Sequence, residues 1–407
     1  IRLAVVRGDA GMGKSRLVQE FRHELVQAGV KVLECRCRAD ASASPYLTLA
    51  EALRRWLDIG ADAAPDAVHK LAPALPEKSR EGEPLGLMAA LLGLAPQPPQ
   101  ASPGGLRQRQ LSLLFDWFGA FAEGRPCCLI VEDWHWVDPS MRELVEHLLE
   151  RQGGPGLLVL ITMRPEAGLA PLPSGRYEQI ELAGLPPEAA RELVGLVGAS
   201  ASLPAGLVRM LAARGDGVPL FLEEATRMAL ELGVARPGAD LAALETVPAS
   251  LQDLLMARLD GLGTAKQVAQ VAAVVGREFS LALLTDLLET GVRAMDSLTL
   301  REGLAVLVGS GHVRSQGGGQ YAFKHALIRD AAYASLWARD RRALHARMVA
   351  LLQERWRELA AMRPELLALH QTEAGQHSQA LAQWELAASN AAARSAELEA
   401  IDRKSVV

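Results

Sequence analysis

The segment with the clearest chemical signal is GDAGMGKS, which begins at Gly8 and ends at Ser15. It fits the pattern G-x-x-x-x-G-K-[ST], follows an apolar run and precedes the helical run RLVQEFRHELVQ. Glycines let backbone N–H groups turn inward around phosphates, and the N-terminus of the following helix adds positive charge. We therefore predict a phosphate-binding loop, with Gly8, Gly11, Gly13, Lys14, Ser15 and Arg16 as its nucleotide-binding residues.

Two residues at the end of this loop have distinct expected roles. Lys14 would supply a point charge to the β- and γ-phosphates and is counted among the catalytic residues, and the Ser15 hydroxyl is the expected Mg²⁺ ligand. ATP, ADP and Mg²⁺ are thus the expected ligands. The alternative, a glycine-rich turn that matches by chance, is disfavoured because a strand pattern and a helix pattern flank the motif.

Two adjacent carboxylates, Glu132 and Asp133, end the apolar run CCLIVED. Carboxylates at the end of a buried strand are costly unless they meet a cation or hydrogen-bond donors. We expect Glu132 to hold Mg²⁺ and Asp133 to orient the attacking water, both in catalytic roles. Neighbouring side chains alternate in direction along a strand, so the two roles could be exchanged. The other alternative is a solvated acidic strand end.

Three further polar residues follow predicted strands. Arg164 closes the run LLVLITMR, where it could reach a γ-phosphate and act as a catalytic sensor. Its alternative role is an exposed arginine that precedes a proline turn. His135 and Asp138 come shortly after the acidic pair and could shape the same loop, in a structural or a catalytic role.

The elements that must position these residues are five short β-like runs separated by amphipathic, helix-length segments. The runs are IRLAVVR, KVLECRC, CCLIVED, LLVLITM and RYEQIEL. Such alternation predicts a parallel sheet covered by helices, so we expect an α/β P-loop NTPase domain over residues 1–183. Residues 59–105 are rich in Ala, Pro, Gly and Glu, and we expect an insertion outside the core, with PQPPQASPGG as a loop.

Strand signals nearly vanish beyond Pro186, and helical patterns dominate residues 184–244. Residues 245–340 resemble a winged helix, because helical segments precede two β-like strips around a glycine turn in HVRSQGGGQYAFKH. Residues 341–401 are predicted to be helical, and small-residue spacing suggests the start of a TPR-like helical hairpin repeat. The residues DRKSVV at 402–407 break this helical pattern, so we expect a non-native tail on a fragment of a longer protein.

The composition restricts the class of protein. The chain has 407 residues, which favours several domains, and its net charge of −5 gives no general attraction to nucleic acid or anionic lipid. No apolar run approaches the 18 residues of a membrane span, and no leader pattern opens the sequence. The four cysteines lack zinc-site spacing and lie in apolar runs, so we expect buried, reduced thiols in a cytoplasmic protein.

An ordered set of motifs resembles a known family. The motifs are GDAGMGKSRL, SPYLTLAEALRRW, LIVEDWHWVDPS, LLVLITMRPE, GDGVPLFLEE, VPASLQDLLMARLDGL, VAAVVGREF and YAFKHALIRDAAYASL. Together they resemble the signal-transducing ATPases with numerous domains (STAND), a branch of the AAA-like P-loop proteins. More narrowly, they are similar to modules attached to class III adenylate or guanylate cyclases and to modules of LuxR-type regulators. The resemblance implies that residues 184–244 form a helical lid.

The resemblance also implies roles for two distant residues. Pro219, in GVP, occupies the family's GxP position, where a lid proline packs against adenine. FKHALIRDAAY resembles the MHD segment, whose histidine, here His325, reaches the β-phosphate of ADP. Ala326 replaces the family's aspartate, which implies a weaker or differently built lock. The alternatives are a proline in the first helical turn and a satisfied interdomain histidine. An upstream segment that encloses the base precedes the first strand in family members, so we expect an incomplete adenine pocket.

The function that follows is a bacterial-type regulatory ATPase module. It would bind and slowly hydrolyse Mg-ATP, switch its domain arrangement between ADP and ATP states, and control an output domain in cis or in trans. A homo-oligomer could form on activation. One alternative is the ATPase core of a LuxR-type transcription activator, and another is a non-hydrolysing scaffold, which the acidic pair disfavours. Direct nucleic-acid binding is not expected, because VPASLQDLLMARLDGLG has few basic residues.

Overall fold

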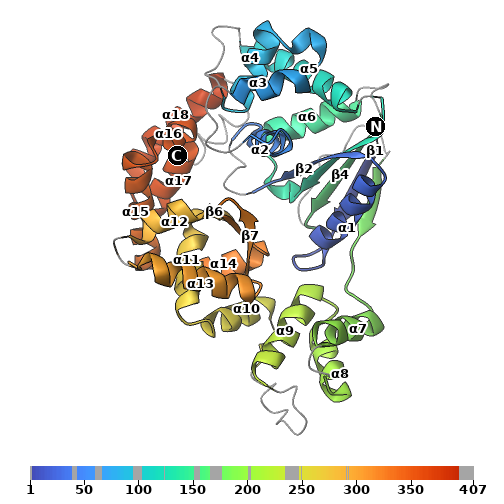
Figure 1. Ribbon diagram of the computed structural model, residues 1–407, viewed down its shortest axis with the longest axis vertical. Coiled ribbons are helices and arrows are strands. Elements are labelled where there is room, and N and C mark those ends of the chain that lie inside the picture. The colour runs from blue at the N-terminus through green and yellow to red at the C-terminus, as the bar shows by residue number, and fades with distance from the viewer. Residues whose placement is uncertain are drawn as a thin grey trace.

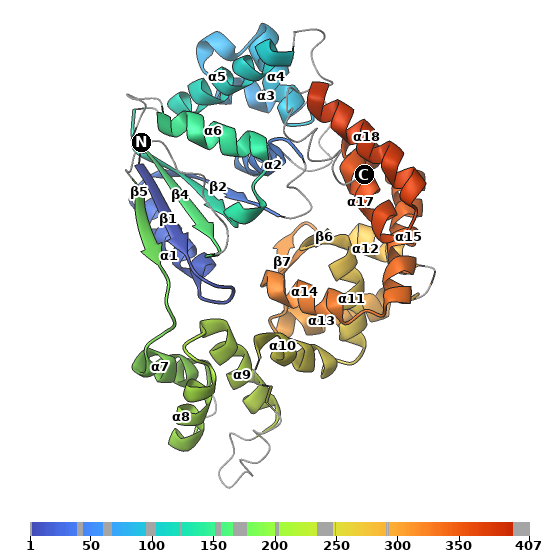
Figure 2. The ribbon, with the colours of Figure 1, turned by 180° about the vertical axis from the view of Figure 1, so that it is seen from behind.

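The chain forms an α/β domain followed by helical regions that curve back toward it (Figures 1 and 2). The computed structural model describes residues 2–38, 44–59, 67–94, 103–122, 124–150, 156–165, 177–199, 203–233, 247–248, 250–289, 291 and 293–393.

Five parallel strands form the sheet of the first domain. They are β1 (Arg2–Arg7), β2 (Lys31–Arg36), β3 (Cys127–Glu132), β4 (Leu157–Met163) and β5 (Tyr177–Glu181). Their order is β2-β3-β4-β1-β5, and every pair is parallel. All five predicted strands are confirmed. Because the strands are parallel, their carboxyl ends lie at one edge, where β4 separates β1 from β3.

Side chains of β3 alternate between the two faces of this sheet. Leu129 and Val131 belong to the main core, together with apolar residues of three helices on that face. Cys128 and Ile130 belong to a smaller cluster with Val18 of the helix on the opposite face. The predicted covering of both faces is confirmed. The three helices are α2 (Leu47–Trp56), α5 (Pro103–Ala122) and α6 (Pro139–Glu150), and the opposite helix is α1 (Lys14–Gln27).

The segment that we expected to lie outside the core contributes to it. Leu71 and Met88 are each 1% exposed and share the main core with Trp117 of α5. The expectation was wrong because Pro and Gly break this segment into short helices whose apolar residues still repeat at helical spacing. Most of PQPPQASPGG lies outside the described residues. The elements of this segment are α3 (Val68–Leu71), two 3-10 turns (Ala72–Ala74 and Glu77–Ser79) and α4 (Gly82–Leu91).

The predicted helical region after the sheet is present and has its own core. Val194, Leu207 and Phe221 pack there, together with Leu254 from the next region. The role of this region as a lid stays a prediction. Its helices are α7 (Pro187–Val197), α8 (Ala205–Arg214) and α9 (Pro219–Glu231), and the next helix is α10 (Leu251–Asp260).

The expected glycine-turn ribbon is present as β7 (Val313–Gly317) and β8 (Gln320–Phe323). A third strand, β6 (Glu278–Ser280), pairs antiparallel with β8. This strand was not predicted, because three residues are too few to show a period of two. The winged-helix assignment itself stays a prediction. The accompanying helices are α11 (Thr264–Val275), α12 (Leu281–Leu288), α13 (Ser297–Gly309) and α14 (Ala326–Ala334).

The last described part is helical, as predicted. The boundary expected at residue 340 falls inside α15, and Leu344 and Met348 of α15 share one core with residues of α11 and α13. The two predicted regions are therefore not separate packing units. The TPR-like assignment stays a prediction, and residues 402–407 lie outside the described part. The helices are α15 (Ala338–Glu354), α16 (Arg357–Met362), α17 (Pro364–Glu373) and α18 (His377–Ala393).

Contacts between distant segments bring α17 against the first domain. The Ser44 hydroxyl donates a hydrogen bond to the buried Glu365 carboxylate of α17.

All four cysteines are free and buried, and burial raises the pKa of each thiol. None of the helices in the described ranges has both the length and the apolar character that a membrane crossing requires.

Candidate functional site

The predicted phosphate-binding loop joins the end of β1 to the start of α1. The Gly8 N–H donates a hydrogen bond to the carbonyl oxygen of Met163 at 3.4 Å, which ties the loop to β4. Gly11 and Gly13 have φ angles of 85° and 89°, a left-handed conformation that favours glycine. Because α1 starts at Lys14 directly after Gly13, the loop places the N-terminus of a helix at the carboxyl edge of the sheet.

The Lys14 side chain folds over this loop. Its Nζ donates hydrogen bonds to the carbonyl oxygens of Gly8 at 2.6 Å and Asp9 at 2.8 Å. No acidic side chain lies in the first turn of α1, so the positive end of the helix is available to an anion. Arg16 lies in that turn, but its side chain is 76% exposed and pairs with Glu20 at 2.6 Å.

Ser15 and Glu132 are brought together, as expected of a shared metal site. The Ser15 hydroxyl lies close enough to the Glu132 carboxylate to lower its pKa, and that carboxylate is 4% exposed at the end of β3. Burial raises the pKa of Glu132, although Arg36, whose Nε lies 3.2 Å from Oε1, and the Ser15 hydroxyl both oppose this effect. A hydroxyl and a carboxylate are ligands suited to Mg²⁺, so these two side chains fit the expected ion.

No group of three or more histidine, cysteine or acidic residues among the described residues could hold a metal ion. Phosphates and water are usual oxygen ligands of Mg²⁺, besides protein groups such as a hydroxyl or a carboxylate.

Asp133 points in a different direction from Glu132. Its φ angle is 57°, and its N–H donates a hydrogen bond to the Thr162 hydroxyl of β4 at 3.1 Å. One of its carboxylate oxygens, Oδ2, accepts a hydrogen bond from Nη1 of Arg277 at 3.3 Å. The two acids thus have different partners, and their separate roles stay a prediction.

Arg164 follows β4, the strand between the phosphate loop and the acidic pair. It is half-buried and lies next to Met163, whose carbonyl oxygen accepts the Gly8 hydrogen bond. This position agrees with the expected neighbourhood of a sensor. A contact of Arg164 with phosphate stays a prediction.

Asp138 has a structural role. It is fully buried, and its Oδ1 accepts hydrogen bonds from the N–H groups of Tyr46 at 3.0 Å and Met141 at 2.8 Å. These bonds cap the start of α6 and anchor the segment before α2. His135 lies in a 3-10 turn at Trp134–Trp136, with its ring centroid 5.3 Å from that of Trp136.

The GVP motif lies on the phosphate loop. The Leu220 N–H donates a hydrogen bond to the carbonyl oxygen of Gly11 at 3.2 Å. A Cβ atom on Gly11 would stand 3.2 to 3.3 Å from side-chain atoms of Leu220, Val218 and Leu251, so glycine permits this close approach. Pro219 occupies the first turn of α9, which is the structural role that the sequence analysis gave as the alternative to adenine packing. Its contact with adenine stays a prediction.

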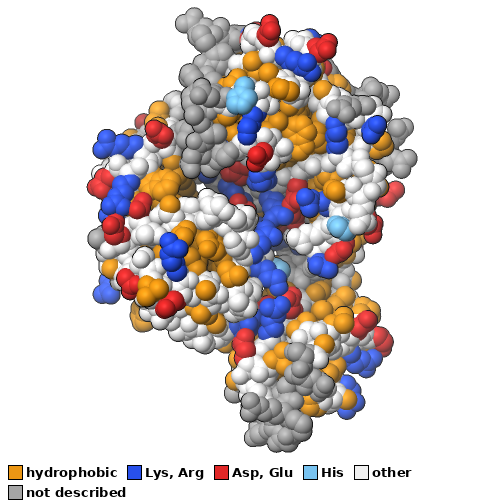
Figure 3. Space-filling model, in the orientation of Figure 1, with side chains coloured by type: hydrophobic (Ala, Val, Ile, Leu, Met, Phe, Trp, Pro, Cys, Tyr) orange, Lys and Arg blue, Asp and Glu red, His pale blue; other side chains and the backbone are white. Residues whose placement is uncertain are grey.

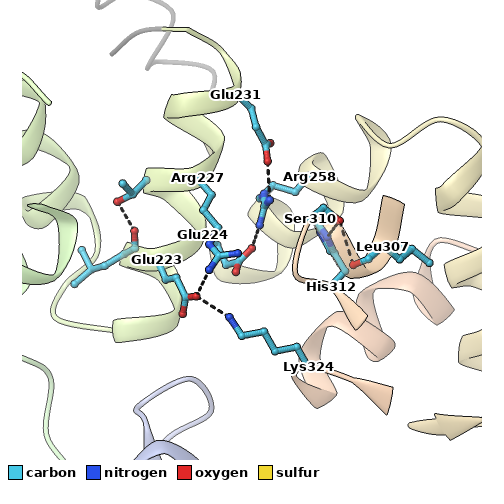
Figure 4. A network of polar contacts seen from close by, with 11 residues as sticks. Glu223, Glu224, Arg227, Glu231, Arg258, Leu307, Ser310, His312 and Lys324 are labelled. Carbon is cyan, nitrogen blue, oxygen red and sulfur yellow. Dashed lines mark hydrogen bonds and ion pairs between the residues drawn. The ribbon is translucent and has the colours of Figure 1, made fainter. Parts of the chain in front are cut away.

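A network of charges joins α9 to the later regions (Figure 4). Arg258 of α10 bonds to Glu224, and the two side chains are 2% and 1% exposed. Arg258 also pairs with Glu231 at 2.7 Å, and Lys324, which follows β8, pairs with Glu223 at 2.7 Å. Because α9 contacts both Gly11 and this network, it links the phosphate loop to the β6-β8-β7 sheet.

His325 lies at the N-terminal end of α14, directly after Lys324. Within the described part of the chain its Nε2 atom is buried and has no hydrogen-bond partner. Burial lowers the pKa of His325 to about 4, and the charges of Lys324, Arg277 and Arg227 add to this effect, against Glu223. His325 is therefore a neutral histidine with an unpartnered nitrogen, and charged side chains of α9 and Arg277 influence it. Lysine and arginine side chains gather in the central hollow of the face that Figure 3 shows.

Several residues of this site had no predicted role. Arg36 could have been found from its position, because the end of β2 lies opposite Glu132 in a parallel register. Thr162 is one residue before the end of β4 and resembles any other strand threonine. Arg277 belongs to VAAVVGREF, a motif that carried the resemblance without a role, and nothing local indicates that it reaches Asp133.

Comparison with known proteins agrees with this geometry. Residues 2–161 match the family model described as AAA ATPase domain. These residues form an AAA-like P-loop ATPase domain. The match covers the phosphate loop, Ser15, and both residues of the acidic pair.

Similarity over the whole chain is more distant. An uncharacterised protein of Rhizobium meliloti strain 1021 is 26% identical over 98% of this chain, which spans 39% of that protein's length. A solved structure of a STAND protein with a tetratricopeptide repeat sensor from Pyrococcus horikoshii has a TM-score of 0.57 at 14% identity, over 99% of this chain and 55% of that one. That likeness concerns the fold. A Walker-type ATPase of Pyrococcus abyssi has a TM-score of 0.38 at 14% identity, over 81% of this chain and 90% of that one.

Proposed function

We propose that this chain is a regulatory ATPase module of the STAND type. It binds Mg-ATP, hydrolyses it slowly, and changes its domain arrangement between ADP and ATP states. The observation that carries the ATPase assignment is the placement of the glycine loop and the start of α1 at the end of β1, with Ser15 close to the buried Glu132 at the end of β3.

The side chains around the phosphate loop and the end of β3 have separate roles in the proposed reaction. On nucleotide binding, Lys14 exchanges the carbonyl oxygens of Gly8 and Asp9 for phosphate oxygens, because the ammonium is already positioned over the loop. Ser15 and Glu132 hold Mg²⁺, which when bound neutralises charge on the phosphates. Asp133 orients the attacking water and accepts its proton, and Arg164 contacts the γ-phosphate from β4.

The regulatory part of the proposal is supported by the contacts of α9. Its first turn bonds to Gly11, and its charged side chains bond to Arg258 and Lys324. A displacement of the loop on nucleotide binding therefore has a direct route to the β6-β8-β7 sheet. Pro219 packs against adenine and His325 reaches the β-phosphate of ADP, so the ligand would bind the two domain arrangements with different free energies, as a switch requires.

The output of the switch is a fused or associated domain, of the kind found in cyclase-linked signalling. The chain spans 39% of the length of the Rhizobium meliloti protein and 55% of the Pyrococcus horikoshii chain, so those two proteins continue beyond the matched part. The module could assemble into homo-oligomers on activation and would not contact nucleic acid itself. It would act in the cytoplasm.

The experiment that tests nucleotide binding compares the parent chain with Lys14→Ala. Saturating Mg-ATP should stabilise the parent by about 2.7 kcal/mol at a hundredfold excess over the dissociation constant. Lys14→Ala should fold but lose this increment, because the loop geometry comes from its backbone. Lys78→Ala is a matched control, since that lysine is 70% exposed and pairs with Asp116 in α5. An equal shift of the melting temperature in Lys14→Ala would contradict the assignment.

A further inference from the structure

The turn between α11 and β6 faces the acidic edge of the first sheet. Gly276 ends α11 with a φ angle of 149°, a conformation that side chains disfavour, and this glycine lets the chain reverse into β6. The carbonyl oxygen of Arg277 accepts a hydrogen bond from the Phe323 N–H at 2.9 Å. Glu278 then pairs with Ala322 in the sheet. The backbone of Arg277 is thus fixed to β8.

Two adjacent side chains of this turn make ion pairs of opposite polarity with the first domain. Nη1 of Arg277 lies 3.3 Å from Oδ2 of Asp133. Oε2 of Glu278 lies 3.8 Å from Nη1 of Arg38, which follows β2 and also pairs with Glu51 at 3.0 Å. In one pair the cation belongs to the turn, and in the other pair the acid does. Together the two pairs align the β6-β8-β7 sheet with the carboxyl edge of the first sheet.

The contact with Asp133 concerns the residue that accepts a proton in the proposed reaction. A carboxylate oxygen that accepts a hydrogen bond from a guanidinium group is directed toward that group and is less available to a water molecule. Both side chains are partly exposed, at 22% for Arg277 and 28% for Asp133, so the pair can open at modest cost.

We propose that Arg277 restrains Asp133 in this domain arrangement, so that full turnover requires the Arg277 side chain to leave Asp133. This inference rests on the proposed function and adds a specific regulatory contact to it. Hydrolysis is then limited by the fraction of molecules in which Arg277 has left Asp133. Arg277 is a positioning residue, because it acts through Asp133 and not on the phosphates.

The test measures the rate of ATP hydrolysis and the affinity for Mg-ATP in variants of the whole 407-residue chain. Arg277→Ala should raise turnover roughly two- to fivefold at unchanged Mg-ATP affinity, the range that a partly exposed ion pair permits. Arg277→Lys keeps a cation and should stay near the parent rate. Glu278→Ala is the matched control, because it breaks the neighbouring pair with Arg38 and leaves the Asp133 contact in place. If Arg277→Ala is unstable, Arg277→Gln keeps most of the stem without the charge.

The outcomes separate this inference from the proposed function. Faster turnover in Arg277→Ala but not in Glu278→Ala supports a specific restraint. Equal increases in both variants, or an unchanged or slower rate in Arg277→Ala, overturn it. If the parent is stabilised by Mg-ATP and neither it nor Arg277→Ala hydrolyses ATP, the restraint fails while nucleotide binding stands. If Mg-ATP neither stabilises nor is hydrolysed by any of these proteins, the proposed function itself fails.

Discussion

The N–H of Leu220 donates a hydrogen bond to the carbonyl oxygen of Gly11 at 3.2 Å, so α9 begins directly on the phosphate loop. The two residues are 209 positions apart in the sequence, and the bond uses only backbone atoms. A movement of the loop around a nucleotide must therefore change the position of α9 or break this bond.

The acidic pair should separate metal binding from turnover. Asp133→Asn should still bind Mg-ATP but lose hydrolysis by about 10²- to 10⁴-fold, because an amide does not accept the proton of the attacking water. Glu132→Gln should instead raise the Mg²⁺ concentration needed for ATP binding, since it removes a charge next to Ser15. Steady-state turnover and Mg²⁺ titrations measure the two effects. The same change in metal dependence for both variants would show that the roles are not divided.

His325 should distinguish ADP from ATP. If it reaches the β-phosphate only in the ADP arrangement, His325→Ala should weaken ADP binding more than ATP binding, by about fivefold or more in the ratio of dissociation constants. Calorimetric titration with each nucleotide gives that ratio.

A second buried histidine provides the control for this measurement. His370 of α17 is 1% exposed, and its pKa is lowered to about 3, first by burial and then by the nearby His345 and arginines. His370→Ala should lower stability without changing the ratio. An unchanged ratio in His325→Ala as well would make His325 a packing residue.

Removing one partner of the buried ion pair between α9 and α10 should lower the free energy of unfolding much more than replacing both partners. Arg258→Met leaves the Glu224 carboxylate buried without its cation and should cost about 3–5 kcal/mol of stability. The double variant Arg258→Met with Glu224→Leu should recover most of this loss. Chemical unfolding measures both. Arg191→Met, which removes an exposed pair with Glu188, is the control. Equal losses in the single and double variants would be inconsistent with this explanation.

His312 is one of several histidines whose lowered pKa should reduce the stability of the later regions in mild acid, together with His325 and His370. Burial, and then the charges of Arg258, Arg227 and Lys324, lower the pKa of His312 to about 3. The unfolded chain binds a proton below pH 6.5 that the folded chain excludes until about pH 3, so stability decreases as pH falls through this window. The slope is about 1.4 kcal/mol per pH unit.

A glutamine at this position removes that slope. Between pH 7 and pH 5, His312→Gln should lose about 2 kcal/mol less stability than the parent. Chemical unfolding at the two pH values gives the difference, and His377→Gln on the exposed surface of α18 is the matched control. If the parent and His312→Gln show the same pH dependence, His312 is not the residue responsible.

The sequence by itself determined the local parts of this protein. The phosphate loop from Gly8 to Ser15 was predictable because strand, glycine turn and helix are each encoded by neighbouring residues. The five parallel strands followed from β-like runs of strand length, and Glu132 and Asp133 followed from their place at the end of one run. The hairpin of β7 and β8 followed from three consecutive glycines between β-like strips. In each case the signal lies within about ten residues.

Only the tertiary structure decided which distant residues meet. The pairing of Asp133 with Arg277 joins positions 144 residues apart, and that of Ser44 with Glu365 joins positions 321 apart. An ion pair has no periodic signature, because a charged side chain at the surface of one domain looks the same whether water or another domain faces it. The choice depends on how the first domain and the later helical regions pack against one another. For the same reason the sequence indicated that α9 exists but not that it begins on the phosphate loop.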